Sequence, residues 1–358
     1  GQNRYCLAAI DLLTGSATSW NPNPDGIIED IAIYGTTVYA GGQFRNIGGQ
    51  QRNYIAALDT VSGLATTWYP GTNSKVLALE ISDTTICIGG QFTSVGGKTR
   101  NYIAALDAVT GFATSWNPDA NSIVNAVTTL GSTVYVGGLF TTIGGQPRNR
   151  IAALDSAFGL AIASWNPGAD NKISALAIAD DILYAGGSFS TIEGQPRNYI
   201  AAFDASSGSV TNWNPNANAA ILDLASLGST IYAGGNFTII GGQSRNFIAA
   251  LDKTSGLASN WNPNANNSIN TLEISGSTIY AGGYFTTIGG QLRNRIAALD
   301  VTTGLASIAW DPDIENTLGS SVYALTISGN ILYAGGTFIN IGGQSRQFIA
   351  GIDLVTGL

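Results

Sequence analysis

Three carboxylates have the spacing of a metal site, in a loop near the end of the sequence. Asp311, Asp313 and Glu315 alternate along the chain, so that oxygen ligands recur at every second residue. Carboxylate oxygens at such positions suit Ca²⁺, a hard cation that takes oxygen ligands. The loop is therefore a candidate calcium site, and a solvated acidic loop is the alternative interpretation.

Most other kinds of site chemistry are excluded by composition. The chain has no histidine and two cysteines, which removes zinc sites and acid–base or triad chemistry that depends on histidine. Cys6 and Cys87 stand where other parts of the sequence carry an aromatic residue. We expect two buried thiols there rather than a disulfide. No cofactor other than calcium is expected, and the protein is not expected to be an enzyme.

The charge pattern also limits the partners. The formal net charge is -8, and eight of the 15 basic residues are single arginines spread evenly along the chain. A protein that binds nucleic acid would gather such charges in one patch, so no nucleic-acid partner is expected. No apolar stretch approaches the length of a membrane-spanning helix, so no membrane span is expected.

One sequence unit recurs throughout. It contains Arg-Asn-aromatic-Ile-Ala-Ala-Leu-Asp, a glycine turn, Trp-Asn-Pro, an apolar run and Tyr-Ala-Gly-Gly-x-Phe. Its aspartate returns after steps of 48, 48, 48, 49, 48, 48 and 53 residues, at Asp11, Asp59, Asp107, Asp155, Asp204, Asp252, Asp300 and Asp353. A period near fifty indicates an array of similar supersecondary units. With no linker between the units, residues 1–358 are expected to form a single domain.

Each unit is expected to be an antiparallel meander of four strands. In one copy the segments 123–129, 133–143, 149–155 and 160–165 are rich in β-branched or aromatic residues and are separated by Gly or Asn turns. No window shows a sustained helical period with caps. The predicted fold class is therefore all-β.

The third strand of the unit indicates how the sheets pack. In Tyr102-Ile103-Ala104-Ala105-Leu106, alternate side chains point to opposite faces of the sheet, and both sets are apolar. Both faces must therefore be buried, as happens when small sheets stack around an axis in a β-propeller. The paired glycines and alanines suit the close approach of neighbouring sheets.

Counting the motifs predicts seven blades. Tryptophan occurs seven times, and Gly-Gly-x-Phe also occurs seven times. The chain begins in the middle of a unit, so residues 1–22 and 313–358 are expected to form the closing blade together. The ring would then be closed by strands from both termini.

One strand is left over in this count, because the third strand is present eight times. Either residues 4–11 or residues 346–353 fill the closing blade, and the other strand is free to lie outside or to pair with another molecule. An unpaired apolar strand is a template for strand addition. The candidate assembly residues are Arg4, Tyr5, Leu7, Ile10, Arg346, Phe348, Ile349 and Ile352.

Two polar residues of the unit have structural interpretations. The aspartate ends a strand and enters a turn, where its carboxylate is expected to cap backbone N–H groups. The arginine seven residues earlier points to the other face of the strand, which leaves a neighbouring copy as its candidate partner. No copy departs from the others in a way that suggests an active site.

Tyr135-Val136-Gly137-Gly138 and the Ala-Leu-Asp-x-x-Thr-Gly stretch that ends at Gly111 resemble the tryptophan-docking repeats of quinoprotein propellers, most of all the delta-sixty repeats of secreted bacterial propellers. The resemblance spans nearly the whole chain. It implies a propeller in an extracellular or bacterial cell-surface setting, but no catalysis, since the adjacent cysteines of quinoprotein sites are missing. It also implies tryptophans that dock between blades, namely Trp20, Trp68, Trp116, Trp165, Trp213, Trp261 and Trp310.

These observations lead to two hypotheses of function. The first is a non-enzymatic extracellular structural or adhesive propeller that assembles with itself, as a polymer or filament, by exchange of a terminal strand. The alternative is a multivalent lectin-like propeller that binds glycans of a cell surface between its blades or on its loop face. The Trp-Asn-Pro motifs would suit stacking platforms with amides, but docking between blades is the favoured role of these tryptophans. Trp68-Tyr69-Pro70 and Trp310-Asp311-Pro312 break that motif, so seven equivalent sugar sites are not expected.

Overall fold

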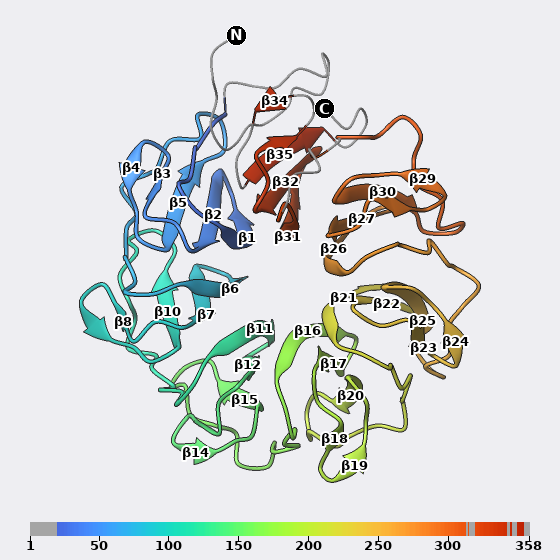
Figure 1. The fold of residues 1–358 in the computed structure, drawn as a ribbon. Coiled ribbons are helices and arrows are strands. Elements are labelled where there is room, and N and C mark those ends of the chain that lie inside the picture. Colours follow the sequence, from blue (N-terminus) through green and yellow to red (C-terminus); the bar gives the residue numbers. More distant parts are fainter. Residues whose placement is uncertain (1–19, 313, 315–318, 342–343, 346–348, 354–358) are drawn as a thin grey trace.

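The computed structural model describes residues 20–312, 314, 319–341, 344–345 and 349–353. Within these ranges the chain is all-β and contains no helix, as predicted. Seven three-stranded antiparallel sheets are arranged around a common axis, and each has a two-stranded hairpin on its outer side (Figure 1).

The first strand of each sheet lies nearest the axis. Its seven residues end in a tight turn to the second strand, usually with Gly at a positive φ, as at Gly35. The first strands are β1 (Ile28–Tyr34), β6 (Val76–Ser82), β11 (Val124–Leu130), β16 (Ile173–Ala179), β21 (Ile221–Leu227), β26 (Ile269–Ser275) and β31 (Val322–Ser328).

The second strand lies in the middle of each sheet and ends at the paired glycines. It is buried along almost its whole length, which explains its β-branched, tyrosine and glycine composition. The second strands are β2 (Thr37–Gly42), β7 (Thr85–Gly90), β12 (Thr133–Gly138), β17 (Ile182–Gly187), β22 (Thr230–Gly235), β27 (Thr278–Gly283) and β32 (Ile331–Gly336).

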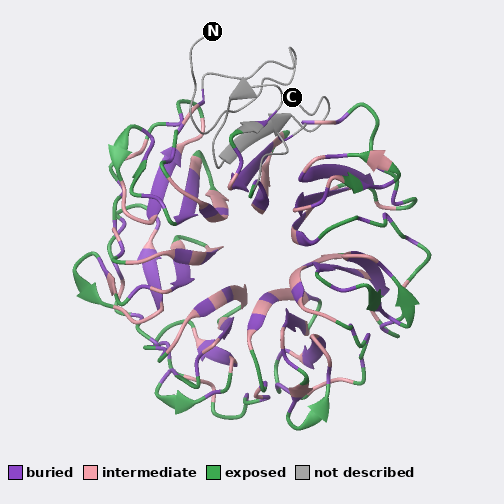
Figure 2. Ribbon diagram, in the orientation of Figure 1, coloured by how far each residue is buried: buried purple, intermediate pink, exposed green. Residues whose placement is uncertain are grey.

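The third strand is buried on both faces, which confirms the sequence argument. Ile103, Ala104, Ala105 and Leu106 are at most 3% exposed. In Figure 2 the buried strands of the first six sheets lie closer to the axis than their largely exposed outer hairpins. The third strands are β5 (Ile55–Asp59), β10 (Ile103–Asp107), β15 (Ile151–Asp155), β20 (Ile200–Asp204), β25 (Ile248–Asp252), β30 (Ile296–Asp300) and β35 (Ile349–Asp353).

A short hairpin connects the second strand to the third. Its turn is formed by two residues at positive φ, such as Gly48 and Gly49. The hairpins are β3 (Asn46–Ile47) with β4 (Gln50–Gln51), β8 (Ser94–Val95) with β9 (Lys98–Thr99), β13 (Thr142–Ile143) with β14 (Gln146–Pro147), β18 (Thr191–Ile192) with β19 (Gln195–Pro196), β23 (Ile239–Ile240) with β24 (Gln243–Ser244), β28 (Thr287–Ile288) with β29 (Gln291–Leu292), and β33 (Asn340–Ile341) with β34 (Gln344–Ser345).

The predicted fourth strand is replaced by an irregular segment. Between residues 160 and 165, only Ala161 forms a bridge to the sheet, opposite Leu154. On either side of this bridge the N–H of Ile162 donates to the carbonyl of Ala153 and the N–H of Asp155 donates to that of Leu160, while the N–H of Ala161 points away from the sheet and donates to the carbonyl of Gly144 at 3.0 Å. The pairing extends no further, so the sheets are three-stranded rather than four-stranded.

The first glycine of each pair lets neighbouring sheets approach each other. A Cβ on Gly234 would lie 2.7 Å from Cγ2 of Ile269, the first residue of the next sheet's first strand. The same relation joins the last sheet to the first, since a Cβ on Gly335 would lie 2.6 Å from Cγ2 of Ile28. Sheets from the two ends of the described chain therefore pack like consecutive sheets.

Candidate functional site

An aromatic contact lies where the last sheet meets the first. Trp20 is fully buried and packs edge-on against Tyr333 of β32, with ring centroids 5.2 Å apart. Its indole Nε1 donates to the carbonyl oxygen of Asp59 in the first sheet, at 2.6 Å. A residue near the start of the sequence therefore bridges the last sheet and the first.

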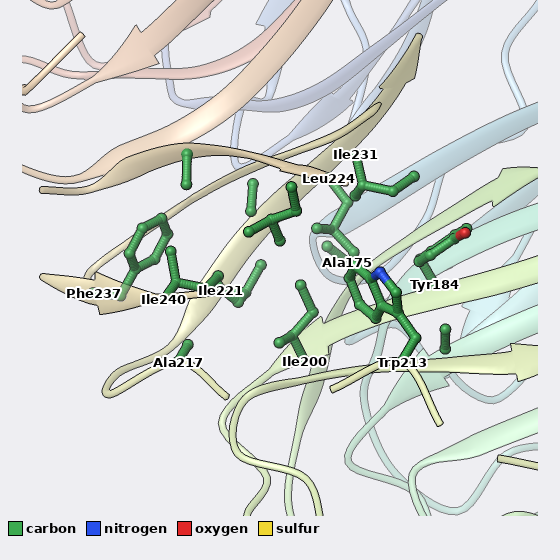
Figure 3. Packing of buried hydrophobic residues seen from close by; sticks show 14 of the residues in the cluster. Ala175, Tyr184, Ile200, Trp213, Ala217, Ile221, Leu224, Ile231, Phe237 and Ile240 are labelled. Carbon is green, nitrogen blue, oxygen red and sulfur yellow. The ribbon is translucent and has the colours of Figure 1, made fainter. Parts of the chain in front are cut away.

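The same arrangement recurs between consecutive sheets. Trp213 packs edge-on against Tyr184 of the fourth sheet, lies near Ile221 and Leu224 of the fifth, and donates from Nε1 to the carbonyl of Asp252 (Figure 3). Equivalent ring pairs with centroids 5.1–5.5 Å apart are Tyr39–Trp68, Tyr135–Trp165, Tyr232–Trp261 and Tyr280–Trp310. Trp116 makes the equivalent hydrogen bond, to the carbonyl of Asp155.

The burial of these rings bears on sugar binding. All seven tryptophans are at most 5% exposed. A stacking platform must present its ring face to the ligand, and these faces are covered by the neighbouring sheets. A glycan site on this protein would need other residues than the tryptophans of Trp-Asn-Pro.

The third position of the seventh sheet is filled from the C-terminal end. β35 pairs antiparallel with β32, with Ile349 opposite Gly335, Gly351 opposite Tyr333 and Asp353 opposite Ile331. This register matches that of β5 on β2, where Ile55 lies opposite Gly41 and Asp59 opposite Thr37. Among the candidate assembly residues, Ile349 and Ile352 lie in this strand, whereas Arg4, Tyr5, Leu7, Ile10, Arg346 and Phe348 fall outside the described residues.

The aspartate of the repeat caps a turn, as predicted. The Oδ1 of Asp59 accepts the backbone N–H groups of Val61 and Ser62 and the hydroxyl of Ser62. These hydrogen bonds lower the pKa of the Asp59 carboxyl. Its role is to hold the turn that follows β5.

The arginine of the repeat binds backbone carbonyls. We expected its partner to lie in a neighbouring copy, and for these hydrogen bonds that expectation is wrong. Arg245 donates from Nη2 to the carbonyl of Ser259 at 2.5 Å and from Nη1 to that of Ser244 at 2.7 Å. Both partners belong to its own copy. The guanidinium therefore fastens the irregular outer segment, and the equivalent bonds join Arg52 to Thr66, Arg100 to Thr114, Arg148 to Ile162, Arg197 to Thr211 and Arg293 to Ser307.

The acidic loop is described only in part. Asp311 forms an ion pair with Arg293, with Nη1 and Oδ2 3.0 Å apart. Asp313 and Glu315 lie outside the described residues, and the part of the chain that is described holds no cluster of three metal-ligating side chains. Calcium binding therefore stays a prediction.

Cys87 is a free, buried thiol, and its burial raises its pKa to about 12. Cys6 lies outside the described ranges.

A second candidate site lies on the axis, where the first strands of all seven sheets line a cavity of about 370 Å³. We call it the axial cavity. Each first strand has a β-bulge at its second residue, which places two consecutive side chains in the lining. The bulged residues are Glu29, Leu77, Asn125, Ser174, Leu222, Asn270 and Tyr323.

Two aspartates of the axial cavity join adjacent sheets in the same way. The Oδ1 of Asp30 accepts the N–H of Ile31 in its own strand. Its Oδ2 accepts the N–H of Leu79 in the next sheet, at 2.7 Å. Asp223 does the same with Leu224 and with Leu272 of the next sheet. Each carboxylate therefore satisfies a backbone donor across a seam between sheets.

Two glutamates further along the first strands extend this pattern. Glu80 accepts the N–H and the hydroxyl of Thr129 in the third sheet, at 3.0 and 2.9 Å. Glu273 stands at the equivalent position of the sixth sheet, where the backbone N–H of Ile327 in the seventh sheet helps to stabilise its charged form. Asp30, Asp223 and Glu273 line the axial cavity together with Glu29, whereas Glu80 is not part of its lining.

Desolvation near the axis raises the pKa of these groups. The pKa values of Asp30 and Asp223 rise to about 7 because burial disfavours their charged forms. For Glu273, burial and the nearby charges of Asp223 and Asp30 raise the pKa to about 7. Burial also raises the pKa of Glu80. Asp30, Asp223 and Glu273 therefore change charge near neutral pH.

Comparison of the copies could have found these four residues, but sequence reasoning missed them. The position of Asp30 and Asp223 carries Ala or Thr in the other five described sheets, and so does the position of Glu80 and Glu273. The signal was a carboxylate inside an otherwise apolar strand. In near-identical copies, such an exception marks a position where the side chain makes a contact that the other copies lack, here a hydrogen bond to the next sheet.

The chain is a β-propeller repeat protein. Two segments, residues 133–156 and 278–300, match the model of a family described as a beta-propeller domain of unknown function, DUF5122. They correspond to β12–β15 and β27–β30, the second and third strands of two sheets with the hairpin between them. No curated protein sequence matches the chain.

Solved propeller structures are similar in fold. The WD40 beta propeller domain of Doa1 has a TM-score of 0.61 at 10% identity, covering 87% of this chain and 90% of that one. The computationally designed Ika8 protein has a TM-score of 0.58 at 15% identity, covering 98% of this chain and 99% of that one. BamB from Moraxella catarrhalis has a TM-score of 0.52 at 22% identity, covering 90% of this chain and 84% of that one. At these identities the likeness concerns the fold alone.

Across the described residues, no helix is long and apolar enough to cross a membrane.

Proposed function

We propose that this protein is a non-enzymatic, extracellular structural or adhesive propeller that assembles with itself through a terminal strand. Its seven sheets are the blades of one ring, closed by segments from both ends of the chain. The resemblance to delta-sixty repeats supports the extracellular setting. The polymer or filament is built from copies of this chain alone.

One observation carries the proposal. Eight segments of the sequence have the pattern of a third strand, and the seven third positions of the sheets are all occupied, the last by β35. Residues 4–11 carry the same apolar pattern and have no third position left in this arrangement. A surplus apolar strand lowers its free energy by pairing with the sheet edge of a second molecule.

The repeated polar residues support a structural role rather than a catalytic one. The aspartates bind turn backbone and the arginines bind carbonyl groups, so both are used to hold the repeat together. The glycan-binding alternative has less support, because the tryptophans that would provide its platforms are buried between sheets. Such a protein would have to bind sugars through its outer loops.

Electron microscopy of truncated chains tests the proposal. The full chain should form filaments with a repeat of the size of one propeller. A chain that lacks residues 346–358 should remain folded but form none, because residues 4–11 are then needed for the vacant third position and no strand is surplus. A chain that lacks only residues 354–358 retains β35 and serves as the matched control. If the chain without residues 346–358 assembled like the full chain, assembly by terminal strand exchange would be wrong. Isolated discs for the full chain would also contradict it, and glycan-array binding would then test the alternative.

A further inference from the structure

We propose that a groove between the first and second sheets binds one neutral saccharide unit, with the ring of Tyr34 as its stacking platform. We call it the tyrosine groove. The site lies within one chain, so it does not depend on the assembly proposed above. It also differs from the Trp-Asn-Pro sites that the sequence suggested, because its platform is a tyrosine and it belongs to one seam.

The tyrosine groove has a volume of about 370 Å³. Its lining comes from the turn between β1 and β2, the irregular outer segment of the first sheet, and the turn that follows β10. Tyr34 is 42% exposed and Val109 is 76% exposed, so a ligand can reach both side chains. Thr36, Thr66 and Thr67 add hydroxyl groups to the lining. None of the described residues that line the groove is charged.

Hydrogen bonds hold two buried residues of the lining in place. The hydroxyl of Tyr39 in the first sheet donates to the carbonyl of Ala108 in the second sheet, at 2.9 Å. The indole Nε1 of Trp68 donates to the carbonyl of Asp107, at 3.0 Å. The two sheets are thus joined on the inner side of the groove. The site is preformed, as small-molecule sites usually are, so binding does not have to order its walls.

The lining suits a neutral molecule that has apolar faces and hydroxyl groups. A sugar ring carries C–H groups on its faces and hydroxyl groups around its edge. The faces can pack on the ring of Tyr34 and on Val109. The hydroxyl groups can bond with threonine side chains, which both donate and accept. The hydroxyl oxygen of Thr66 accepts the N–H of Trp68 at 3.2 Å, and its own O–H can donate to the ligand.

Comparison of the copies distinguishes this seam from the others. The first strand ends at Tyr34 in the first sheet, whereas the first strands of the other sheets end at residues that are not aromatic, namely Ser82, Leu130, Ala179, Leu227, Ser275 and Ser328. Between the fourth and fifth sheets, Lys253 and Asp180 form an ion pair with Nζ and Oδ2 3.0 Å apart. These two residues align with Ala108 and Gly35 of the tyrosine groove. Packing of the sheets therefore requires no aromatic residue at this place, and ligand binding accounts for the one that is present.

An array of neutral, sulfated and sialylated oligosaccharides tests the proposal in the full chain, followed by calorimetry with the neutral sugar that binds best. Tyr34→Ser introduces the residue that three other sheets carry at this position, so the fold tolerates it. It should weaken binding by about tenfold or more, because the stacking platform is lost. Tyr34→Phe keeps the ring and should change the affinity by less than about threefold. Leu227→Ala, at the equivalent and partly exposed position of the fifth sheet, is the matched control and should bind like the parent.

The expected result is one binding site per chain for a neutral sugar, lost in Tyr34→Ser and retained in Tyr34→Phe and Leu227→Ala. Binding to no sugar on the array, or to the sulfated or sialylated sugars alone, would overturn the proposal. Undiminished binding by Tyr34→Ser would also overturn it, since the sugar would then bind elsewhere on the ring. Thr67→Val removes one hydroxyl group of the lining and should weaken binding by roughly twofold to tenfold. An unchanged affinity for this variant would contradict the part assigned to Thr67.

Discussion

Trp20 and Tyr333 are separated by more than 300 residues in the sequence, and their rings meet edge-on at an angle of 75°. The same ring pair recurs with nearly the same distance and angle between Trp68 and Tyr39 of the first sheet, and the indole of Trp68 donates to the carbonyl of Asp107 in the second sheet. The seam between the last sheet and the first is therefore built with the parts of an ordinary seam. What distinguishes it is that no covalent connection between consecutive copies crosses it.

Trp20→Ala should destabilise the protein by about 3–5 kcal/mol, because it leaves a large cavity between the last sheet and the first. Its indole is fully buried and donates to the carbonyl of Asp59, so both the packing and one hydrogen bond are lost. Chemical denaturation would measure the change. Trp213→Ala, at a seam inside the chain, is the matched control. A loss of stability for Trp213→Ala without one for Trp20→Ala would show that the terminal seam is open in solution.

Gly335→Ala tests the same seam from the opposite side. The added Cβ would lie 2.6 Å from Cγ2 of Ile28, so one sheet must shift, at a cost of about 1–3 kcal/mol. Gly234→Ala places the Cβ 2.7 Å from Cγ2 of Ile269 and should cost the same. Equal shifts in Tm by calorimetry are the expected outcome. A harmless Gly335→Ala beside a harmful Gly234→Ala would contradict close contact between the last sheet and the first.

The sequence predicts the third strand well because one strand contains all the information needed. Both alternating sets in Ile103-Ala104-Ala105-Leu106 are apolar, so the strand can only be stable with both faces covered. The fourth strand was predicted wrongly because its apolar pattern is real but its pairing with the third strand stops after one bridge, between Ala161 and Leu154. The guanidinium of Arg148 binds the carbonyl of Ile162, a partner that is not visible in the segment itself.

The axial carboxyl groups were missed for a different reason. Asp30 and Asp223 are almost two hundred residues apart, and each looks like a single substitution in an apolar strand. Only the ring arrangement brings them to one axis, and only the bulge turns their side chains into its lining. The pattern of one repeat determines its strands, whereas differences between repeats become meaningful once the repeats are placed around a common axis.

Arg245→Met should lower the free energy of unfolding by about 1–3 kcal/mol, since two backbone carbonyl groups lose the hydrogen bonds of a buried, charged donor. Those acceptors belong to Ser244 and Ser259, and the aliphatic part of the side chain is preserved by methionine. Arg45→Met, at an exposed arginine of the first hairpin, provides the control and should change little. If urea denaturation gave the same midpoint for both variants, the proposed fastening of the outer segment would be wrong.

Stability should rise as the pH falls from 8 to 5. In the folded protein Asp30, Asp223 and Glu273 have pKa values of about 7, whereas in the unfolded chain such groups titrate near their ordinary values of about 4. Between pH 4 and pH 7 the folded state binds more protons than the unfolded state, so protonation favours folding. This gain in stability is lost as the pH rises through 7. The turn aspartates, such as Asp59, act in the opposite sense. Their lowered pKa makes their contribution disappear only when the pH falls below about 4.

Thermal melts at pH 5 and pH 8 measure this effect in the parent and in the double variant Asp30→Asn/Asp223→Asn. Asparagine keeps an oxygen that can accept the N–H of Leu79 or Leu272 but carries no charge at either pH, so the difference in Tm should shrink. Asp83→Asn alters an exposed carboxylate in the turn after β6 and should leave the difference as it is in the parent. Because desolvation of the charged carboxylates is the cause, the parent must be the less stable at pH 8. A higher Tm at pH 8, or an equal difference in the double variant, would mean that the axial groups remain well hydrated and titrate near their ordinary pKa.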